Sequence, residues 1–339
     1  MQPLSPSPDT TDVAGPTSAE LTPAALEREL ETYRRQLTGY CYRMLGSGFE
    51  ADDAVQETMV RAWRNIGGFD GRSSLRSWLY RIATNVCLDH LRSRQRRALP
   101  MEMGPSSPAT TPPGATLPEN SWVQPVPDAR VLPVDGDPAE LAAARESIRL
   151  AFVAALQHLP PRQRAVLILC EVLRWKASEV AELLDTSTTS VNSALQRARA
   201  TLSSRDLTAA GEDPTDPEIR ALLDRYVDAF ERYDMGALVA LLHEDATLSM
   251  PPFALWLQGA DQLIEWFVGH GSVCEGSRLV ATAANGTAAF GSYHRAEGGG
   301  HEPFGLQVLE ISGGRITGHH NFLGPDLFEA FGLPLRLER

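Results

Sequence analysis

The feature that most constrains this chain of 339 residues is the stretch 49–97, where two helical patterns follow each other almost without a spacer. In the first pattern, apolar residues recur at the spacing of a helix that buries one face. They are Val55, Met59, Ala62, Trp63 and Ile66. The pattern opens with acidic residues, which the helix dipole favours in a first turn, so ordinary capping would also explain them.

A glycine-rich loop separates this helix from a second one, for which Ser73 or Ser74 is the expected N-terminal cap. Its apolar residues again share one side: Leu75, Trp78, Leu79, Ile82 and Val86. Four arginines close the stretch: Arg92, Arg94, Arg96 and Arg97. A solvated helix end would explain such a run, but a basic track for a single nucleic-acid strand would explain it equally.

This order of helices and loop resembles region 2 of the extracytoplasmic-function (ECF) sigma factors in the sigma-70 family. The resemblance implies that the first helix docks on the clamp helices of the largest subunit of core RNA polymerase. The matching positions are Asp52, Asp53, Gln56 and Glu57. It also implies that loop 69–74 and the second helix capture the melted minus-ten strand. The candidate contacts of that helix are Arg76, Arg81, Asn85, Asp89 and Arg92.

A second pattern, at 159–202, predicts a helix-turn-helix. A short supporting helix carries its apolar residues at Ala177, Val180, Ala181 and Leu184, with Ser178 as the expected cap. After a turn at 185–187, the next helix turns these residues inward: Val191, Leu195, Ala198 and Leu202. Its outward side chains are polar, as a major-groove reader needs: Thr188, Thr189, Ser190, Asn192, Ser193, Gln196, Arg197 and Arg199.

A lone helix-turn-helix pattern is weak evidence, but this one follows the first stretch in the order that the same sigma group shows. The motifs that resemble its region 4 are Leu159-Pro160-Pro161-Arg162-Gln163-Arg164 and Gln196-Arg197-Ala198-Arg199. The resemblance implies contacts with the minus-thirty-five element and with the polymerase flap region. Asn192 and Ala194 stand where basic residues are usual, and Asp185 stands at a usual glycine, which predicts modest affinity for duplex DNA.

The net charge of −12 disfavours DNA binding for the chain as a whole, but the charge is distributed unevenly along the sequence. Residues 26–100 carry 13 basic and 9 acidic groups, and residues 141–210 carry 9 and 6. Residues 211–339 carry 8 basic and 19 acidic groups, so the negative charge lies mainly outside the predicted DNA-binding parts. Between those parts, residues 98–138 hold ten of the 24 prolines, which predicts an extended linker without a core. Trp122 and Val123 are its exception and are expected to dock on the polymerase or on a neighbouring domain.

The last third of the chain predicts an α+β domain. An amphipathic pattern from Ile219 to Phe230 is expected to form a helix, and a second helix is expected to begin near Leu238. Strand-like stretches separated by glycine-rich turns then predict an antiparallel sheet. They are 246–250, 277–284, 288–295, 304–312 and 315–322. The stretches His243-Glu244-Asp245-Ala246-Thr247 and Gly318-His319-His320-Asn321-Phe322, in this setting, resemble a SnoaL-like domain of the nuclear transport factor two superfamily.

Some members of that superfamily are cyclases or isomerases, and others bind ligands. A ligand pocket would be lined by Met250, Trp256, Trp266 and His319, although the same side chains would also fill a core. Strand alternation sends His319 and His320 to opposite faces, so at most one of them faces a pocket. No catalytic residue, cofactor or metal site is expected, since the histidine spacings fit no metal set.

The fold class expected is therefore multidomain. Its parts are a tail (1–25), region 2 (26–97), a proline-rich flexible linker (98–140), region 4 (141–206), a short linker (207–214) and the SnoaL-like domain (215–335). The four cysteines are scattered and expected to be reduced, and no apolar run approaches the roughly 20 residues of a membrane span. These features predict a cytoplasmic protein.

The functional hypothesis is a sigma factor that binds core RNA polymerase and directs initiation at minus-ten and minus-thirty-five elements. In it, the acidic SnoaL-like domain packs on regions 2 and 4 and regulates them in cis. The alternative is a ligand-sensing DNA-binding regulator, or a SnoaL-type enzyme with a DNA-targeting N-terminal half. An ordinary regulator has no use for an acidic polymerase-docking helix. A pure enzyme would depend on Asp245 or His319 and would ignore DNA.

Overall fold

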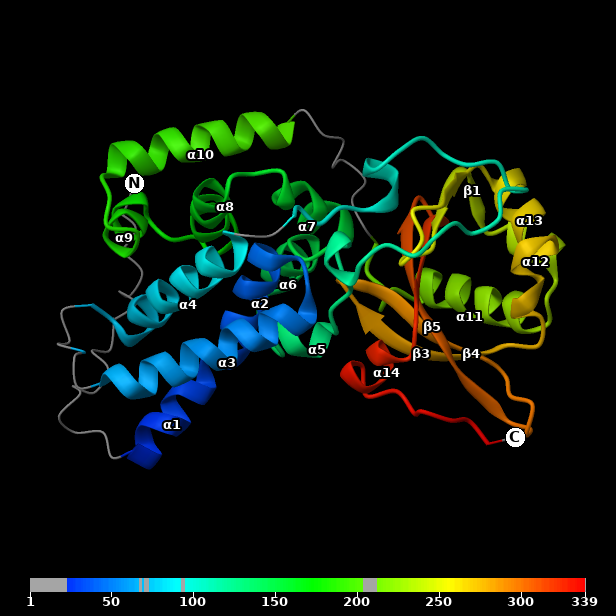
Figure 1. Cartoon of the computed structure of the whole chain (residues 1–339), viewed down its shortest axis with the longest axis horizontal. Coiled ribbons are helices and arrows are strands. Elements are labelled where there is room, and N and C mark those ends of the chain that lie inside the picture. Colours follow the sequence, from blue (N-terminus) through cyan, green and yellow to red (C-terminus); the bar gives the residue numbers. More distant parts are fainter. Residues whose placement is uncertain (1–22, 67–68, 70–72, 93–94, 204–211, 339) are drawn as a thin grey trace, which may run out of the picture.

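A computed structural model of the chain describes residues 23–66, 69, 73–92, 95–203 and 212–338. Figure 1 shows a helical half and a half built around a sheet, joined by a segment that runs between them. Residues 1–22 of the expected tail and residues 70–72 of the expected strand-capturing loop lie outside the described residues, while residues 23–25 of that tail belong to helix α1 (Pro23–Thr32). Within those residues, no helix combines the length and apolarity that crossing a membrane requires.

The first helical group packs around buried side chains of its second and third helices. Its members are α1 (Pro23–Thr32), α2 (Arg34–Leu45), α3 (Gly48–Asn65) and α4 (Leu75–Leu91). Ser47 caps α3 by accepting a hydrogen bond from the Glu50 amide at 3.3 Å, and Ser74 caps α4 through the Ser77 amide at 3.1 Å. The cap expected at Ser73 or Ser74 is therefore Ser74.

The stripe predicted for α3 is only partly buried. Val55, Met59 and Ala62 are in the core, but Trp63 is 58% exposed. The expectation that Trp63 packs inward is wrong, because the buried face of α3 continues through Ala54 and Thr58, on the side of the stripe away from Trp63. An exposed tryptophan on this helix is a surface available to a partner.

The second helical group contains the helix-turn-helix. It is formed by α7 (Leu150–Gln157), α8 (Pro161–Leu167), a π-helical turn (Ile168–Val172), α9 (Ala177–Leu183) and α10 (Thr188–Ser203). Ser178 does not cap α9, which begins one residue earlier. The Glu179 carboxylate instead accepts the Lys176 amide at 2.7 Å. Asp185 adopts the left-handed backbone (φ 49°) that explains why glycine is usual there.

The segment between the two groups is not the coreless linker that its composition predicts. It contains α5 (Asp128–Val131) and α6 (Pro138–Glu146). Trp122 is buried, and Val123 and Val126 belong to the core of the helical half. The amide of Val123 bonds to the Ala98 carbonyl, and that of Gln124 to the Gly46 carbonyl. Apolar anchors and backbone hydrogen bonds therefore hold this proline-rich segment against the first helical group.

The C-terminal domain is a six-stranded sheet of order β2-β1-β6-β5-β4-β3. Its strands are β1 (Leu242–Ser249), β2 (Trp256–Gln258), β3 (Arg278–Ala284), β4 (Thr287–Arg295), β5 (His301–Ser312) and β6 (Arg315–Leu323). The five expected strands are present, but β2 was not predicted and β1 pairs with β6 in parallel. Leu242 belongs to β1, so the expected second helix is only the short α12 (Met235–Val239).

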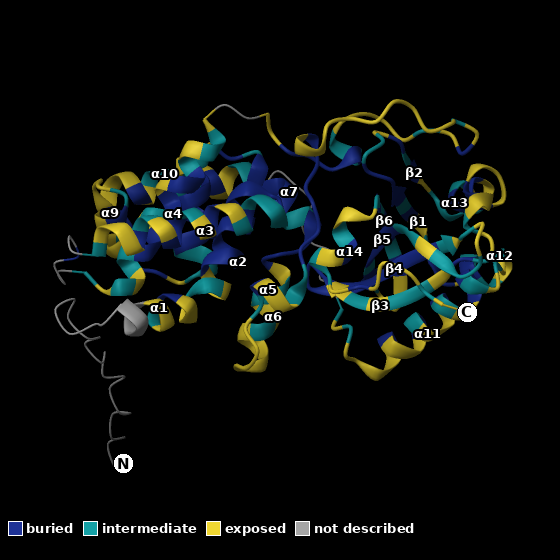
Figure 2. Cartoon of the chain, turned by 60° about the horizontal axis from the view of Figure 1, so that its bottom comes forward, coloured by how far each residue is buried: buried dark blue, intermediate teal, exposed yellow. Residues whose placement is uncertain are grey.

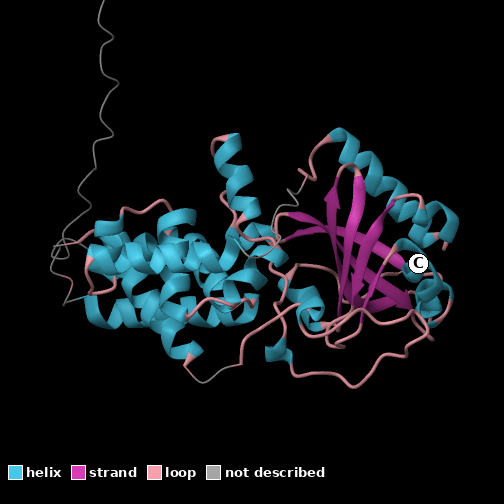
Figure 3. Cartoon of the chain, turned by 90° about the horizontal axis from the view of Figure 1, so that it is seen from above, coloured by secondary structure: helices cyan, strands magenta, loops and turns pink. Residues whose placement is uncertain are grey.

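One face of this sheet is covered by α11 (Pro217–Glu231) and α13 (Ala260–Val268), as Figure 3 shows from above. The other face carries α14 (Asp326–Ala330) and contributes to the core of the helical half. His319 and His320 lie on opposite faces, as strand alternation predicts. His319 bonds to Tyr226 beneath α11, and His320 bonds to Ser249 on the other side.

Candidate polymerase and promoter interfaces

The acidic start of α3 forms the candidate polymerase-docking face. Asp53 and Gln56 are exposed, while Asp52 and Glu57 are partly exposed. Asp52 is paired with Arg130 of α5, and burial raises its pKa despite that guanidinium. Burial opposes the ionised form of Glu57 as well, but hydrogen bonds from His90 and Arg61 lower its pKa overall. The face is thus anionic, and α5 covers its Asp52 end.

Along α4, the candidate minus-ten residues fall into two groups. Asn85, Asp89 and Arg92 are exposed on successive turns, with Arg92 Nη1 3.2 Å from Asp89 Oδ1. Arg76 and Arg81 instead face the second helical group. The Arg76 guanidinium carbon lies 5.0 Å from the centre of the Trp175 ring.

Arg81 Nη2 donates to the carbonyl oxygen of Glu182 in α9 at 3.1 Å. The helix expected to hold the minus-ten strand therefore contacts the supporting helix of the helix-turn-helix. Two of its candidate DNA contacts therefore make intramolecular contacts with the second helical group.

Arg97 is not part of a solvated or DNA-facing basic end, as the arginine run predicted. It is 6% exposed, and its Nη2 lies 2.6 Å from Glu50 Oε1. Its Nη1 donates to the carbonyls of Trp122 at 2.6 Å and Glu119 at 3.0 Å. Arg97 thus ties α3 to the inter-domain segment. The sequence gives no signal that separates this arginine from its exposed neighbours.

On α10, the outward residues are placed as the pattern predicts. All are exposed except Ser193, which is partly buried: Thr188, Thr189, Ser190, Asn192, Ser193, Gln196, Arg197 and Arg199. Ser187 accepts the Ser190 amide at 3.1 Å, so the polar start of the helix is capped. Arg199 pairs with Glu171 at the end of the π-helical turn.

Two buried arginines join the helical groups. Arg164 belongs to the region 4 motif, but neither arginine was expected to be buried. Arg43 of α2 donates to the Ser147 carbonyl at 3.1 Å and to its hydroxyl at 2.6 Å. Arg164 of α8 donates to the Met44 carbonyl and to Gln157 Oε1. Burial lowers the pKa of each guanidinium to about 10. In these hydrogen bonds both guanidiniums donate to uncharged carbonyl and hydroxyl oxygens, so this interface holds desolvated positive charge.

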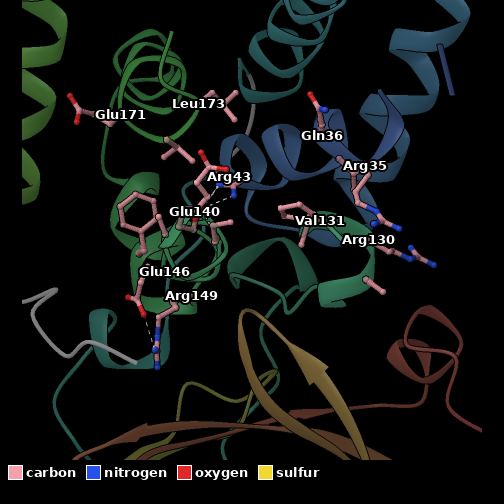
Figure 4. Close-up of a pocket in the computed structure, with 18 of the residues that line it drawn as sticks. Arg35, Gln36, Arg43, Arg130, Val131, Glu140, Glu146, Arg149, Glu171 and Leu173 are labelled. Carbon is pink, nitrogen blue, oxygen red and sulfur yellow. Dashed lines mark hydrogen bonds and ion pairs between the residues drawn. The ribbon is translucent and has the colours of Figure 1, made fainter. Parts of the chain in front are cut away.

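A cleft of about 1870 Å³ opens between α2, α5, α6, the turn at 171–174 and the hairpin end of β5 and β6. Figure 4 shows that arginines and glutamates from several elements line it, and Arg149 Nη1 lies 3.3 Å from Glu146 Oε1. Asp52, Asp53 and Gln56 also line it. The candidate polymerase-docking face therefore borders the junction of all three parts of the chain.

At that junction, the β3–β4 hairpin tip inserts into the helical half. Asn285 is 1% exposed, and its side-chain amide donates to Tyr42 Oη and to the Ile148 carbonyl, both at 2.6 Å. Its Oδ1 accepts the Val126 amide at 3.0 Å. The Gly286 amide donates to Asp128 Oδ1 at 2.8 Å. One asparagine thus bonds to α2, to the inter-domain segment and to the chain entering α7.

The candidate ligand-pocket residues lie together but are packed. Met250, Trp266 and His319 are buried and belong to the face covered by α11 and α13, while Trp256 is half-buried on edge strand β2. His319 Nε2 lies 2.6 Å from Tyr226 Oη, and its Nδ1 lies 3.0 Å from Asn321 Nδ2. Tyr226 donates onward to Gln307. Core filling, the plainer of the two expectations, agrees with this packing.

Burial lowers the pKa of His319 to about 3, against 6.5 in an unfolded chain. Because the folded pKa is depressed, the neutral ring contributes its full stability above pH 6.5 and loses it as pH falls toward 3. The loss is about 1.4 kcal/mol per pH unit. We expect the free energy of unfolding of the C-terminal domain, measured with urea, to fall with this slope below pH 6.5. His319→Gln is expected to remove this pH dependence. If the slope of His319→Gln equals that of the parent and that of a His243→Gln control, the assignment is contradicted.

Comparisons with known proteins agree with this division of the chain. The family models Sigma-70 region 2, Sigma-70 region 4 and SnoaL-like domain match residues 30–97, 149–202 and 223–319. The ECF RNA polymerase sigma factor SigG of Mycobacterium tuberculosis is 47% identical over 310 residues, which cover 90% of this chain and 82% of that protein. SigJ of the same organism is 29% identical over 252 residues, 71% of this chain and 72% of SigJ.

The crystal structure of Mycobacterium tuberculosis SigJ has the same fold, with a TM-score of 0.57 at 23% identity over 91% of this chain and 99% of that one. Two helical groups in this order, with a helix-turn-helix in the second, define a transcription initiation factor of the sigma-70 type. The chain belongs to the ECF RNA polymerase sigma factors and carries a SnoaL-like domain fused at its C-terminal end. Membership of this family implies binding to core RNA polymerase and to promoter DNA.

Proposed function

We propose that this sigma factor docks on core polymerase through Asp52, Asp53, Gln56 and Glu57 and acts in the cytoplasm, where that polymerase works. Its minus-ten contacts are Arg76, Arg81, Asn85, Asp89 and Arg92. Its minus-thirty-five contacts are the outward residues of α10. We also propose that the SnoaL-like domain regulates these surfaces in cis, by holding regions 2 and 4 together.

The observation that carries the cis-regulation proposal is the position of Asn285. Its bonds to Tyr42, Val126 and Ile148 span the parts that must separate if region 2 and region 4 are to reach two promoter elements about two helical turns apart. The contacts of Arg76 and Arg81 with region 4 support the same idea, because those side chains must leave Trp175 and Glu182 before they touch DNA.

The experiment changes the hairpin tip in the intact chain. Gly286 has φ +75°, and a side-chain carbon there would lie 2.8 Å from the Arg145 carbonyl oxygen. Gly286→Val is therefore expected to unseat the tip and to raise run-off transcription several-fold at subsaturating protein. Gly313→Val is the matched control, since Gly313 also has a positive φ (+60°) but open space around it. Equal activity of the two variants would refute cis regulation by this contact.

We propose that the SnoaL-like domain is not catalytic. Its inward histidine, His319, has both ring nitrogens within hydrogen-bond distance of neighbouring side chains, and burial holds its pKa far below neutrality. A group that remains neutral and satisfied in this way is poorly placed to exchange a proton with a substrate. The same bonds account for its burial as a structural residue.

A further inference from the structure

Residues 104–117 of the proline-rich segment leave the helical half and run across the SnoaL-like domain; we call them the strap. Figure 2 shows this stretch as an exposed loop passing β2 and α13. The Ser107 amide donates to the Trp256 carbonyl at 2.8 Å, and the Leu117 amide donates to the Pro252 carbonyl at 2.9 Å. β2 is an edge strand, so the strap covers backbone that the sheet leaves unpaired on that side.

Side chains of the domain also bond to the backbone of the strap. Trp256 Nε1 donates to the Gly104 carbonyl at 2.9 Å, and Gln262 Oε1 accepts the Ala109 amide at 2.9 Å. His270 Nε2 lies 3.1 Å from the Thr110 carbonyl, to which it must donate. An indole, an amide and an imidazole from β2, α13 and the following turn are thus directed at main-chain groups. This is how extended peptides are recognised in known grooves.

The strap also inserts one side chain. Ala109 is 2% exposed and belongs to the same apolar cluster as Leu263 and Trp266. It occupies a tight turn in which the Thr111 amide donates to the Pro108 carbonyl at 3.0 Å. Pro108 begins this turn, and the methyl group of Ala109 fills the space at its tip in the apolar cluster. A longer side chain at position 109 therefore cannot enter the cluster.

We propose that the SnoaL-like domain carries a binding groove for an extended, proline-rich peptide, and that residues 104–117 are its built-in occupant. The groove is formed by Pro252, Trp256, Gln262 and His270. It selects a small residue at the tip of a turn that follows proline. The prolines of the strap lack an amide hydrogen, and the amides that the groove uses belong to Ser107, Ala109 and Leu117.

The groove gives the domain a second attachment to the sigma part, independent of the hairpin tip. Seven residue steps lead from Arg97 to Gly104 at the start of the strap, a span of at most about 25 Å. While the strap is bound, the acidic domain therefore remains beside the end of region 2. A proline-rich peptide supplied by another protein would compete for the groove and release this second attachment.

The test uses the full chain, its Ala109→Arg variant and a dye-labelled synthetic peptide with the sequence of residues 104–117. The parent's own strap competes at a high effective concentration, so the peptide should bind the parent weakly. The variant, whose strap no longer fits, should bind the peptide at least ten-fold more tightly by fluorescence anisotropy. A scrambled peptide of the same composition is the control and should bind neither protein.

Hydrogen exchange on the parent gives a readout that does not depend on the variant. The Ser107 and Leu117 amides should exchange slowly in the parent, and faster in Ala109→Arg or when unlabelled peptide is added in excess. Exchange at unprotected rates in the parent would overturn the proposal. Equal binding of the authentic and scrambled peptides to the variant would overturn it as well.

Discussion

Replacing Asp53 by arginine is expected to lower the affinity of the chain for core RNA polymerase by about 100-fold, or about 2.7 kcal/mol. Asp53 is exposed on the first turns of α3, beside Gln56, and the docking proposed for this acidic face requires a basic surface on the polymerase. Reversing a charge at such an interface removes an attraction and adds a repulsion. The measurement is anisotropy of the labelled chain titrated with purified bacterial core enzyme.

The matched control is Asp224→Arg, which makes the same change at an exposed position on α11 of the SnoaL-like domain. It alters net charge equally but lies away from α3, so binding should equal that of the parent. If both variants bind as the parent does, the docking face has been assigned to the wrong surface. If both lose affinity equally, net charge rather than the α3 face governs binding.

Arg97→Met is expected to destabilise the helical half by about 3–5 kcal/mol, because it removes a buried ion pair with the Glu50 carboxylate and two hydrogen bonds to carbonyl oxygens. The Arg97 guanidinium is buried, and it bonds to Glu50, Glu119 and Trp122. The quantity to measure is the urea midpoint of the first unfolding transition. The side chain of Arg92 is 80% exposed, so Arg92→Met should change stability by less than about 0.5 kcal/mol. Similar midpoints for both variants would mean that Arg97 is not structural.

Local patterns in the sequence predicted much of the fold. Alternation and turn residues located five strands, and Ser74, α3, α4, α9 and α10 follow from caps and helical spacing. The same periodicity placed His319 and His320 on opposite faces of the sheet. These features depend on neighbours within a few residues, which is why they can be read from the chain.

Features that depend on long-range contacts were not predictable in this way. Trp122 and Val123 were expected to dock on the polymerase or on a neighbouring domain, and both are buried in this chain, but nothing in the composition of residues 98–140 predicts that Ala109 is buried on the sheet domain. The burial of Arg97, Arg43 and Arg164 likewise depends on carbonyls supplied by distant segments. Trp63 was misplaced because a stripe of apolar residues shows which side of a helix is buried but not how wide the buried face is.

For the candidate interfaces too, features set by local sequence could be predicted and features set by long-range contacts could not. Exposure of Asp53, Gln56 and the outward residues of α10 agrees with the positions that the family resemblance implies. The sequence did not predict that Arg76 and Arg81 contact region 4, because that depends on how two helical groups pack. The residue types on these surfaces could thus be predicted from the sequence. Whether each side chain is free to contact DNA could not.

The most direct test of the central claim is run-off transcription with purified bacterial core polymerase on genomic promoter fragments, with and without the intact chain. The account predicts discrete transcripts only when the chain is present, and more of them with Gly286→Val than with Gly313→Val. Absence of core binding and of transcripts with all three proteins would contradict the claim that this chain initiates transcription.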